Sequence, residues 1–286
     1  MDLNRSRAAT QQAPETTIQD WIIATDLDGT LLDHFYPYEK AAAGINELQR
    51  DHPNVTVVLA TSKTLAELLP FTELFDQAPP LIFENGAGLA NPQPGTHEYR
   101  VTPLGIDHPT LRKVLLELRA QGYQFLGFAD MSSLQVADIT GLSLTEAQQA
   151  KERQFSEPLS WEGSVSQLVA FERALVSRGL TLVSGGRFHH VAAHTNKADA
   201  LQRWLSQRSS TAPAHVVACG DAPNDTQMLL GADTALVFPH KHHLRAGNYM
   251  ALEHKQLIRV HQPGPDAWMQ AVRNLVSTPN TLRECS

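Results

Sequence analysis

The amino-acid sequence predicts an α/β protein built on a doubly wound parallel sheet, with a smaller α/β domain inserted into it. Short apolar runs alternate with amphipathic stretches of helical length, a pattern typical of strands that are covered by helices on both faces. Polar residues directly follow several of these runs, at the edge where open parallel sheets bind ligands. The pattern changes between about residues 103 and 190, which indicates the inserted domain.

The main sheet is predicted from apolar runs that contain β-branched residues and lie between polar or turn residues. These strands are Ile22–Thr25, Val55–Ala60, Pro80–Phe83 and His215–Cys219. The helices expected between or after them are Glu39–Arg50, Leu65–Leu74, Asn196–Gln207 and Thr226–Leu230. Pro70 is expected to kink or divide the second helix, because proline lacks the N–H that a helix interior needs.

The inserted segment has its own alternation of helices and strands, which we interpret as two βαβ-like units. Its predicted helices are Pro109–Gln121 and Ser164–Ser177, and its predicted strands are Tyr123–Phe125, Thr181–Ser184 and Arg187–Ala193. Gly185-Gly186 is expected to form a tight hairpin turn between the last two strands. The resulting domain prediction is a disordered tail at 1–18, a core at 19–102 and 191–286, and an inserted domain at 103–190.

Composition narrows the classes of function. The chain has 286 residues with 42% hydrophobic and 19% charged residues, as expected for a soluble globular protein. A net charge of -7 argues against a general nucleic-acid surface, and no run is long enough to span a membrane. Two cysteines, Cys219 and Cys285, make a disulfide framework improbable, and the polar N-terminus lacks a signal peptide. We therefore expect a cytoplasmic protein.

The stretch Asp26-Leu-Asp28-Gly29-Thr30 carries the strongest functional signal. It follows a buried strand, where a carboxylate needs a cation or hydrogen bonds to offset its desolvation. Side chains at i and i+2 of a strand point the same way, so both carboxyl groups can face one site. Gly29 lets the chain turn and brings backbone N–H groups close to an anion. This combination indicates Mg²⁺ with phosphate, although an Asp-Gly turn without function is the alternative.

Three further pieces follow in order along the chain, and each also has a purely structural reading. Thr61-Ser62-Lys63-Thr64 ends the second strand, and Thr61 could be a helix N-cap. Lys197 opens an amphipathic helix and could be a solvated lysine. Gly220–Asp225 follows the last predicted strand and could be a polar turn. The His-rich stretch Pro239–His243 has no metal-ligand spacing and is interpreted as a solvated loop.

Taken together, the four motifs resemble the haloacid dehalogenase superfamily of phosphohydrolases, which implies a Rossmann-like core. The resemblance implies that Asp26 is the nucleophile, that Asp28 is the general acid and base, and that Thr61 and Ser62 bind the phosphoryl group. It further implies that Lys197 neutralises the phosphoryl charge. The implied Mg²⁺ ligands are a carboxylate of Asp26, the backbone carbonyl of Asp28 and Asp221, with Asn224 and Asp225 orienting them.

Other motifs resemble one family of that superfamily, the mannosyl-3-phosphoglycerate phosphatases, over about residues 20 to 275. They are Thr61–Thr64, Glu84–Ala87, Phe128–Ser132, Thr140–Leu142, Arg153–Pro158 and Gly185–Phe188. We expect Arg153 and Arg187 to bind the glycerate end of the substrate, because arginine suits carboxylates, although both could be surface residues. Glu84 and Asn85 could bind sugar hydroxyls or form only a turn, and Thr140-Gly141 could present backbone groups to the substrate.

The expected activity is therefore a Mg²⁺-dependent hydrolysis of 2-O-mannosyl-3-phosphoglycerate to phosphate and mannosylglycerate, a compatible solute, through an aspartyl-phosphate. The inserted domain would be a cap that sets substrate specificity. A related substrate, glucosyl-3-phosphoglycerate or sucrose phosphate, is the nearest alternative. A sugar phosphomutase and a non-catalytic binding protein are alternatives from other classes. The expected partner is a small phosphorylated sugar-glycerate, with no nucleic acid and no membrane.

Overall fold

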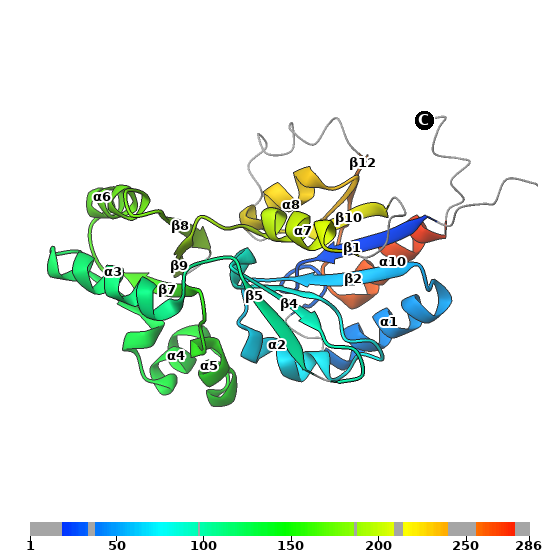
Figure 1. The fold of residues 1–286 in the computed structure, drawn as a ribbon, viewed down its shortest axis with the longest axis horizontal. Helices are drawn as coiled ribbons and strands as arrows, with labels where there is room; N and C mark the ends of the chain where they lie inside the picture. Colours follow the sequence, from blue (N-terminus) through cyan, green and yellow to red (C-terminus); the bar gives the residue numbers. More distant parts are fainter. Residues whose placement is uncertain are drawn as a thin grey trace, which may run out of the picture.

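The computed structural model describes residues 19–33, 38–96, 98–185, 188–208, 214–239 and 256–277. The predicted tail at 1–18, most of the His-rich stretch and Cys285 lie outside these residues. The described strands form one eight-stranded and one four-stranded sheet. Figure 1 shows the two sheets side by side along the long axis of the molecule.

The large sheet is mostly parallel, which confirms the predicted fold class. Its strand order is β12 (Gln256–Arg259), β11 (Thr234–Val237), β10 (Ala214–Gly220), β1 (Asp20–Thr25), β2 (Val55–Ala60), β3 (Leu81–Phe83), β4 (Gly88–Pro92) and β5 (Tyr99–Pro103). The strands from β12 to β3 pair in parallel, whereas β4 and β5 extend the sheet antiparallel. All four predicted strands of this sheet are present.

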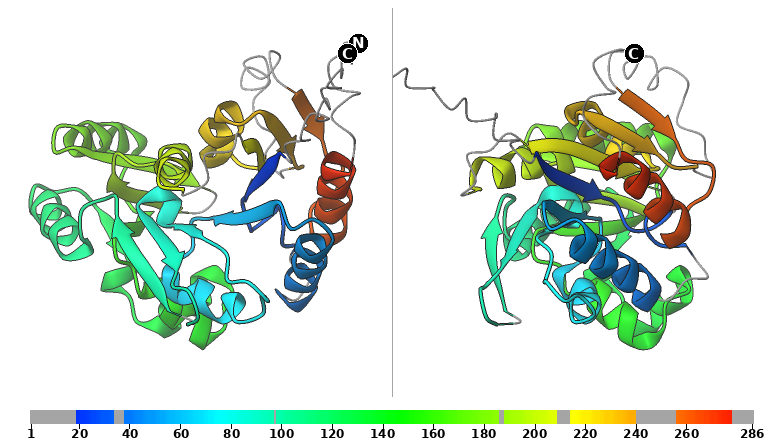
Figure 2. Two further views of the ribbon diagram at one scale, coloured as in Figure 1. Left: turned by 45° about the vertical axis from the view of Figure 1, so that its right-hand side comes forward. Right: turned by 90° about the vertical axis from the view of Figure 1, so that its right-hand side faces the viewer.

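Helices cover both faces of the large sheet, as Figure 2 shows. On one face, α1 (Tyr38–Asp51), α2 (Leu65–Thr72) and α10 (Pro265–Val276) contribute to one apolar core. On the other face, α7 (Lys197–Ser206) and α8 (Thr226–Gly231) contribute to a second core. Pro70 lies inside α2, which remains a single helix and ends at Thr72, so Pro70 does not divide this helix and the predicted kink stays a prediction.

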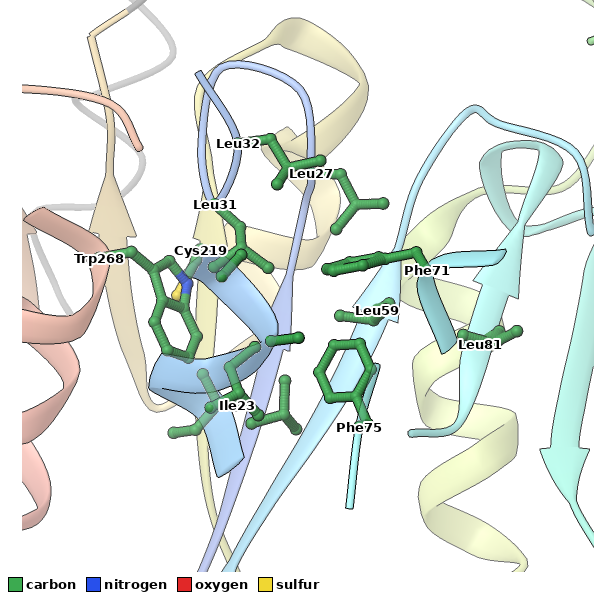
Figure 3. Packing of buried hydrophobic residues seen from close by; sticks show 14 of the residues in the cluster. Ile23, Leu27, Leu31, Leu32, Leu59, Phe71, Phe75, Leu81, Cys219 and Trp268 are labelled. Carbon is green, nitrogen blue, oxygen red and sulfur yellow. The ribbon is translucent and has the colours of Figure 1, made fainter. Parts of the chain in front are cut away.

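The apolar core also anchors the loop after β1. Leu27 and Leu31 of this loop are fully buried, and Figure 3 shows them above Ile23, Leu59 and Phe71. On the far side of the same core, the indole Nε1 of Trp268 in α10 donates to the Thr25 hydroxyl at 2.9 Å. Burying a leucine side chain stabilises a fold by about 1.5–3 kcal/mol. The core therefore fixes the loop that carries Asp26 and Asp28.

The small sheet is entirely antiparallel, with the order β6 (Phe125–Gly127), β7 (Ser156–Trp161), β9 (Phe188–Ala193) and β8 (Leu180–Gly185). Strands β7 and β8 run parallel on either side of β9 and are joined by helix Val165–Val176, so one βαβ-like unit is present. The second is not, because β6 and β7 are antiparallel neighbours, and the proline-containing strand β7 was not predicted. Gly185 pairs with Phe188, while Gly186 and Arg187 lie outside the described residues.

Helices α3 (His108–Ala120) and α6 (Val165–Val176) share an apolar cluster with the strands of the small sheet. Helices α4 (Ser133–Thr140) and α5 (Leu144–Lys151) form a separate cluster with Phe128, Leu126 and Phe188. We call α3 to β9 the small-sheet unit and the other described residues the large-sheet unit. The predicted domain boundaries at 102/103 and 190/191 stay a prediction. No helix in the described ranges is both long and apolar enough to cross a membrane.

Candidate active site

The candidate site lies at the carboxyl ends of β1, β2 and β10. Asp26 directly follows β1, and its backbone N–H donates to the Cys219 carbonyl of β10 at 2.9 Å. Thr25 pairs with Leu59 of β2 and with Cys219, so Thr61 and Asp221 begin the neighbouring loops just beyond Asp26. Three of the four predicted motifs therefore meet at one edge of the sheet, as the alternation of strands and helices predicts.

The remaining motif is a buried lysine, Lys197, which contacts two of the other motifs. Lys197 is the first residue of α7 and is 1% exposed. Its Nζ donates to Asp26 Oδ1 at 2.6 Å and to Asp225 Oδ1 at 2.7 Å. Burial alone would lower the pKa of Lys197, but Asp225 and Asp26 outweigh burial and raise it. The ammonium group therefore stays charged, and the solvated-lysine alternative is wrong.

Three carboxylates form an acidic cluster around this lysine. Oxygen atoms of Asp26, Asp221 and Asp225 all lie within 4.8 Å of one another, and all three residues are buried. Burial raises the pKa of Asp26, Lys197 opposes this, and Asp225 and Asp221 raise it further, so the pKa lies well above its ordinary value. Three carboxylates against one ammonium leave two formal negative charges that a divalent cation would balance.

The hydrogen bonds separate the roles of the three carboxylates. Asp225 uses both oxygens within the protein, because Oδ1 accepts from Lys197 and Oδ2 accepts from the N–H groups of Asp221 and Ala222. Asp225 therefore holds the backbone of the loop that carries Asp221, and its orientation of a metal shell stays a prediction. Asp26 and Asp221 remain the pair best placed to bind a cation, and the donor set of carboxylate oxygens fits Mg²⁺.

Gly29 brings the loop after β1 close to Asp221. Its φ is +85°, a conformation that side chains other than glycine rarely adopt. A Cβ atom at this position would lie 2.6 Å from Asp221 Oδ2. The hydroxyl of Thr30 donates to Asp221 Oδ1 at 3.3 Å. The sequence motif thus holds a carboxylate that is 191 residues away along the chain.

Asp28 is placed differently from the buried carboxylates. Its side chain is 59% exposed, and its Oδ2 lies 3.2 Å from Nζ of Lys63. Burial would lower the pKa of Lys63, but Asp28 and Glu67 outweigh burial and raise it. Lys63 therefore holds the exposed carboxylate in place. Sequence reasoning assigned Lys63 no role, although Lys63 and Glu67 have the i, i+4 spacing of an ion pair on a helix.

Thr61 is fully buried after β2, and its hydroxyl accepts from the Lys63 N–H at 3.2 Å. The N-cap of α2 is Thr64, which forms a capping box with Glu67. The N-cap alternative for Thr61 is therefore wrong. Thr61 begins the loop after β2, next to the loop that begins with Asp26, and its role in phosphoryl binding remains a proposal.

The turn Glu84–Gly86 holds two loops of the site together. The Glu84 and Asn85 N–H groups donate to the carbonyls of Lys63 and Thr61, each at 2.9 Å. Asn85 Oδ1 accepts from Nδ2 of Asn224 at 3.0 Å, so Asn224 bonds to this turn. Glu84 and Asn85 both have positive φ, at 50° and 58°. Backbone strain of about 1–3 kcal/mol at each residue is typical of functional sites.

The structure places Glu84 differently from the expected sugar contact. Its side chain is fully buried and accepts from the Gln154 N–H at 2.8 Å, the Phe155 N–H at 3.1 Å and the Ser156 hydroxyl at 2.6 Å. Three bonds from the small-sheet unit occupy the carboxylate. We therefore revise the role of Glu84 from binding sugar to joining the two units.

The other predicted substrate residues also have structural contacts. Arg153 Nη1 donates to the Ser62 carbonyl at 2.8 Å, and only 6% of its side chain is exposed. Thr140 bonds back to the Val136 carbonyl at 2.6 Å, and Gly141 ends α4 with a φ of +83°. Thr140 and Gly141 therefore form the C-terminal end of helix α4. Arg187 lies outside the described residues.

Fold and site together define an α/β protein with a mostly parallel, Rossmann-like main sheet and an acidic cluster at the carboxyl ends of its strands. A haloacid dehalogenase-like hydrolase model matches residues 23–130, and a sucrose-6F-phosphate phosphohydrolase model matches residues 135–274. The two models match successive parts of the chain and both describe hydrolases, so the chain belongs to the haloacid dehalogenase-like hydrolase superfamily. The second model is that of a phosphohydrolase, so the chain is a phosphatase-like hydrolase.

Solved structures agree with this fold. A protein from Thermoplasma acidophilum has a TM-score of 0.63 at 14% identity, covering 91% of this chain and 99% of its own. A haloacid dehalogenase-like hydrolase from B. subtilis has a TM-score of 0.56 at 18% identity, with coverages of 90% and 98%. A Bacteroides thetaiotaomicron protein, studied among phosphatases of this superfamily, has a TM-score of 0.58 at 17% identity, with coverages of 94% and 99%.

Proposed function

We propose that the protein is a Mg²⁺-dependent sugar phosphatase that works through an aspartyl-phosphate. The contact between Asp26 and the buried Lys197, beside Asp221, is the observation that carries the proposal. Lys197 fixes the Asp26 carboxylate and keeps a positive charge where the phosphoryl group would lie. Mg²⁺, held by Asp26, Asp221 and the Asp28 carbonyl, would stabilise the charge of the transferring phosphoryl group.

The proposed reaction has two displacements at phosphorus. A carboxylate oxygen of Asp26 bonds to phosphorus while the bond from phosphorus to the ester oxygen of the leaving group breaks, and Asp28 gives a proton to that departing oxygen. Water then attacks the aspartyl-phosphate, Asp28 takes its proton, and inorganic phosphate leaves. Thr61 and the Ser62 N–H would hold the phosphoryl oxygens. The exposed position of Asp28 suits contact with both the leaving group and water.

The proposed substrate is 2-O-mannosyl-3-phosphoglycerate, and two observations support a glycosylated phosphate ester. The motifs Thr61–Thr64, Thr140–Leu142 and Arg153–Pro158 resemble the mannosyl-3-phosphoglycerate phosphatase family. The match to a sucrose-6F-phosphate phosphohydrolase model covers most of the small-sheet unit, so sucrose 6-phosphate is the second candidate. In either case we propose that the small-sheet unit is the cap that selects the substrate and that the enzyme works in the cytoplasm.

Phosphate release tests both parts of the proposal. We expect release from mannosyl-3-phosphoglycerate with Mg²⁺, much weaker release from its glucosyl analogue, sucrose 6-phosphate and an aryl phosphate, and none after chelation. Asp26→Asn should abolish release from every ester. A preference for sucrose 6-phosphate would contradict the proposed substrate but support the proposed phosphatase reaction. Release that survives Asp26→Asn would contradict the proposed nucleophile.

A further inference from the structure

A cavity of 430 Å³ lies between α2 of the large-sheet unit and the α4–α5 turn of the small-sheet unit. Figures 1 and 2 show α5 beside α2, and the two helices are in contact. The volume falls in the range of about 300–1,000 Å³ that is usual for small-molecule sites. The polar residues on its walls are Tyr38, Lys63, Glu67, Ser143, Thr145, Glu146 and Gln149.

The cavity borders the candidate active site through Lys63. The side chain of Lys63 lines the cavity, and its Nζ lies 3.2 Å from the carboxylate of Asp28. Asp28 is the residue that would protonate the oxygen leaving phosphorus. The part of the substrate attached to that oxygen would therefore extend from Asp28 toward this cavity.

The charges on the cavity walls limit which part of a substrate fits. Lys63 is the one cation among the lining residues, and Glu67 and Glu146 are carboxylates. Asp28, which does not line the cavity, pairs with Lys63, and Oε1 of Glu67 lies 3.9 Å from Nζ of the same lysine. Hydrogen bonds from Ser143 lower the pKa of Glu146, so its carboxylate is ionised near neutral pH. A carboxylate ligand would thus meet a negative cavity whose lysine is already paired.

Several groups on the walls suit hydroxyl groups. The ring of Tyr38 is held by stacking on Phe71 at a centroid distance of 4.7 Å. Within the described part of the chain, the Tyr38 hydroxyl and the Gln149 side-chain amide make no hydrogen bond. Carboxylates accept hydrogen bonds from hydroxyls, and an amide both donates and accepts. An aromatic ring offers a flat apolar face for the C–H groups of a sugar.

We propose that this cavity binds the neutral glycosyl group of the substrate, and that the glycerate carboxylate, where there is one, lies outside it. Gln149, Glu146 and Tyr38 are then specificity-determining residues. Leu142 of the Thr140–Leu142 motif also lines the cavity, which gives that motif a place in substrate selection. The inference rests on the proposed phosphatase function for the direction of the leaving group.

Gln149→Ala and Glu146→Gln test the proposal kinetically. Glu146→Gln keeps an acceptor for the Ser143 N–H but removes the charge. Each change should lower kcat/KM for a glycosylated phosphate ester by a factor about ten times larger than the factor for an aryl phosphate. The reason is that a hydrogen bond to the sugar is lost. Gln148→Ala, on the same helix but exposed and outside the lining, is the matched control and should change neither value.

Equal losses on both kinds of ester would overturn the proposal. So would a Glu146→Gln variant that binds 3-phosphoglycerate more tightly than the wild type while leaving the glycosylated ester unchanged, since the cavity would then hold a carboxylate.

A binding measurement separates this inference from the proposed function. Saturation-transfer NMR with sucrose and mannosylglycerate needs no turnover, and we expect transfer to ring protons that Gln149→Ala abolishes and Gln148→Ala retains. Transfer in a wild type that releases no phosphate would support the cavity and contradict the phosphatase. A wild type that hydrolyses esters but shows no transfer to either sugar would contradict the cavity alone.

Discussion

At the scale of single residues, Lys197 contributes to both stability and chemistry. It lies between two buried carboxylates, and the distances of 2.6 and 2.7 Å leave no room for water between the partners. Removing one member of a buried ion pair leaves an uncompensated charge. The same ammonium group is the one positive charge within the acidic cluster of the described residues. The site therefore needs Lys197 both for its stability and for its chemistry.

Lys197→Met should therefore affect two measurements. We expect kcat for phosphate release to fall roughly a hundred- to a thousandfold, as when one donor to a transition-state oxygen is lost. Unfolding free energy should fall by about 3–5 kcal/mol in chelator. Chemical denaturation and steady-state kinetics measure these effects. Lys40→Met removes an exposed pair with Asp266 and should cost at most about 1 kcal/mol. Similar losses in both variants would contradict the special role of Lys197.

His190 predicts a pH dependence of stability. Its Nδ1 is buried without a hydrogen-bond partner among the described residues. Burial, followed by the charges of Arg153 and His189, lowers the pKa of His190 from 6.5 to about 3. The unfolded chain binds the proton below about pH 6.5 and the folded chain does not, so stability falls as the pH decreases from 6.5 toward 3.

His190→Gln should reduce this loss of stability by up to about 1.4 kcal/mol per pH unit, because glutamine does not titrate in this range. Denaturation at pH 7.5 and pH 4.5 measures the difference. The exposed His261→Gln provides the control and should leave the pH dependence unchanged. An unchanged acid sensitivity in His190→Gln would show that other groups cause it.

At the scale of elements, the strands that carry the catalytic motifs could be predicted because they are continuous apolar runs. β1 and β2 are almost wholly buried, and their sequences show it directly. β7 has the sequence Ser-Glu-Pro-Leu-Ser-Trp and pairs on both edges, although proline usually excludes an interior strand. Its pairing depends on distant strands, which local sequence patterns do not record.

The turn Glu84–Gly86 shows how one element positions another. A Cβ atom on Gly86, whose φ is +92°, would lie 2.1 Å from the Asn196 carbonyl oxygen at the start of α7. Gly86→Ala should therefore displace Lys197 and lower both kcat and stability. Gly179→Ala also changes a residue of positive φ but meets no atom within 4 Å, so it should cost only about 1–2 kcal/mol. Equal kcat in the two variants would contradict this coupling.

At the scale of the whole molecule, the sequence predicted the acidic cluster better than the contacts between the two units. Asp26 and Asp221 belong to motifs that directly follow parallel strands, so the predicted topology brought them together. Lys197 opens a helix instead, and its place in the site followed only from the family resemblance. Glu84 and Arg153 are also motif residues, but their type suggested substrate binding. Their partners in the other unit are backbone groups and, for Glu84, also the Ser156 hydroxyl, and a sequence gives no sign of such partners.

The link between the two units predicts how Arg153 acts. If its guanidinium bound the glycerate end, Arg153→Ala would raise KM for mannosyl-3-phosphoglycerate and spare an aryl phosphate. In the structure it donates to the Ser62 carbonyl, next to Thr61, and lies 3.9 Å from Glu67. We therefore expect Arg153→Ala to lower kcat by a similar factor on both esters, because the phosphoryl-binding loop loses its support.

Arg153→Lys is the informative companion variant. Lysine keeps the charge but cannot donate to the Ala150 and Ser62 carbonyls together with the fixed geometry of a guanidinium. If Arg153 supports the loop, Arg153→Lys should resemble Arg153→Ala on both esters. If a positive charge facing the substrate carboxylate were the main requirement, Arg153→Lys would have a KM for the glycerate ester close to that of the wild type. Steady-state kinetics of both variants on both esters therefore decides whether Arg153 selects the substrate or holds the two units in register.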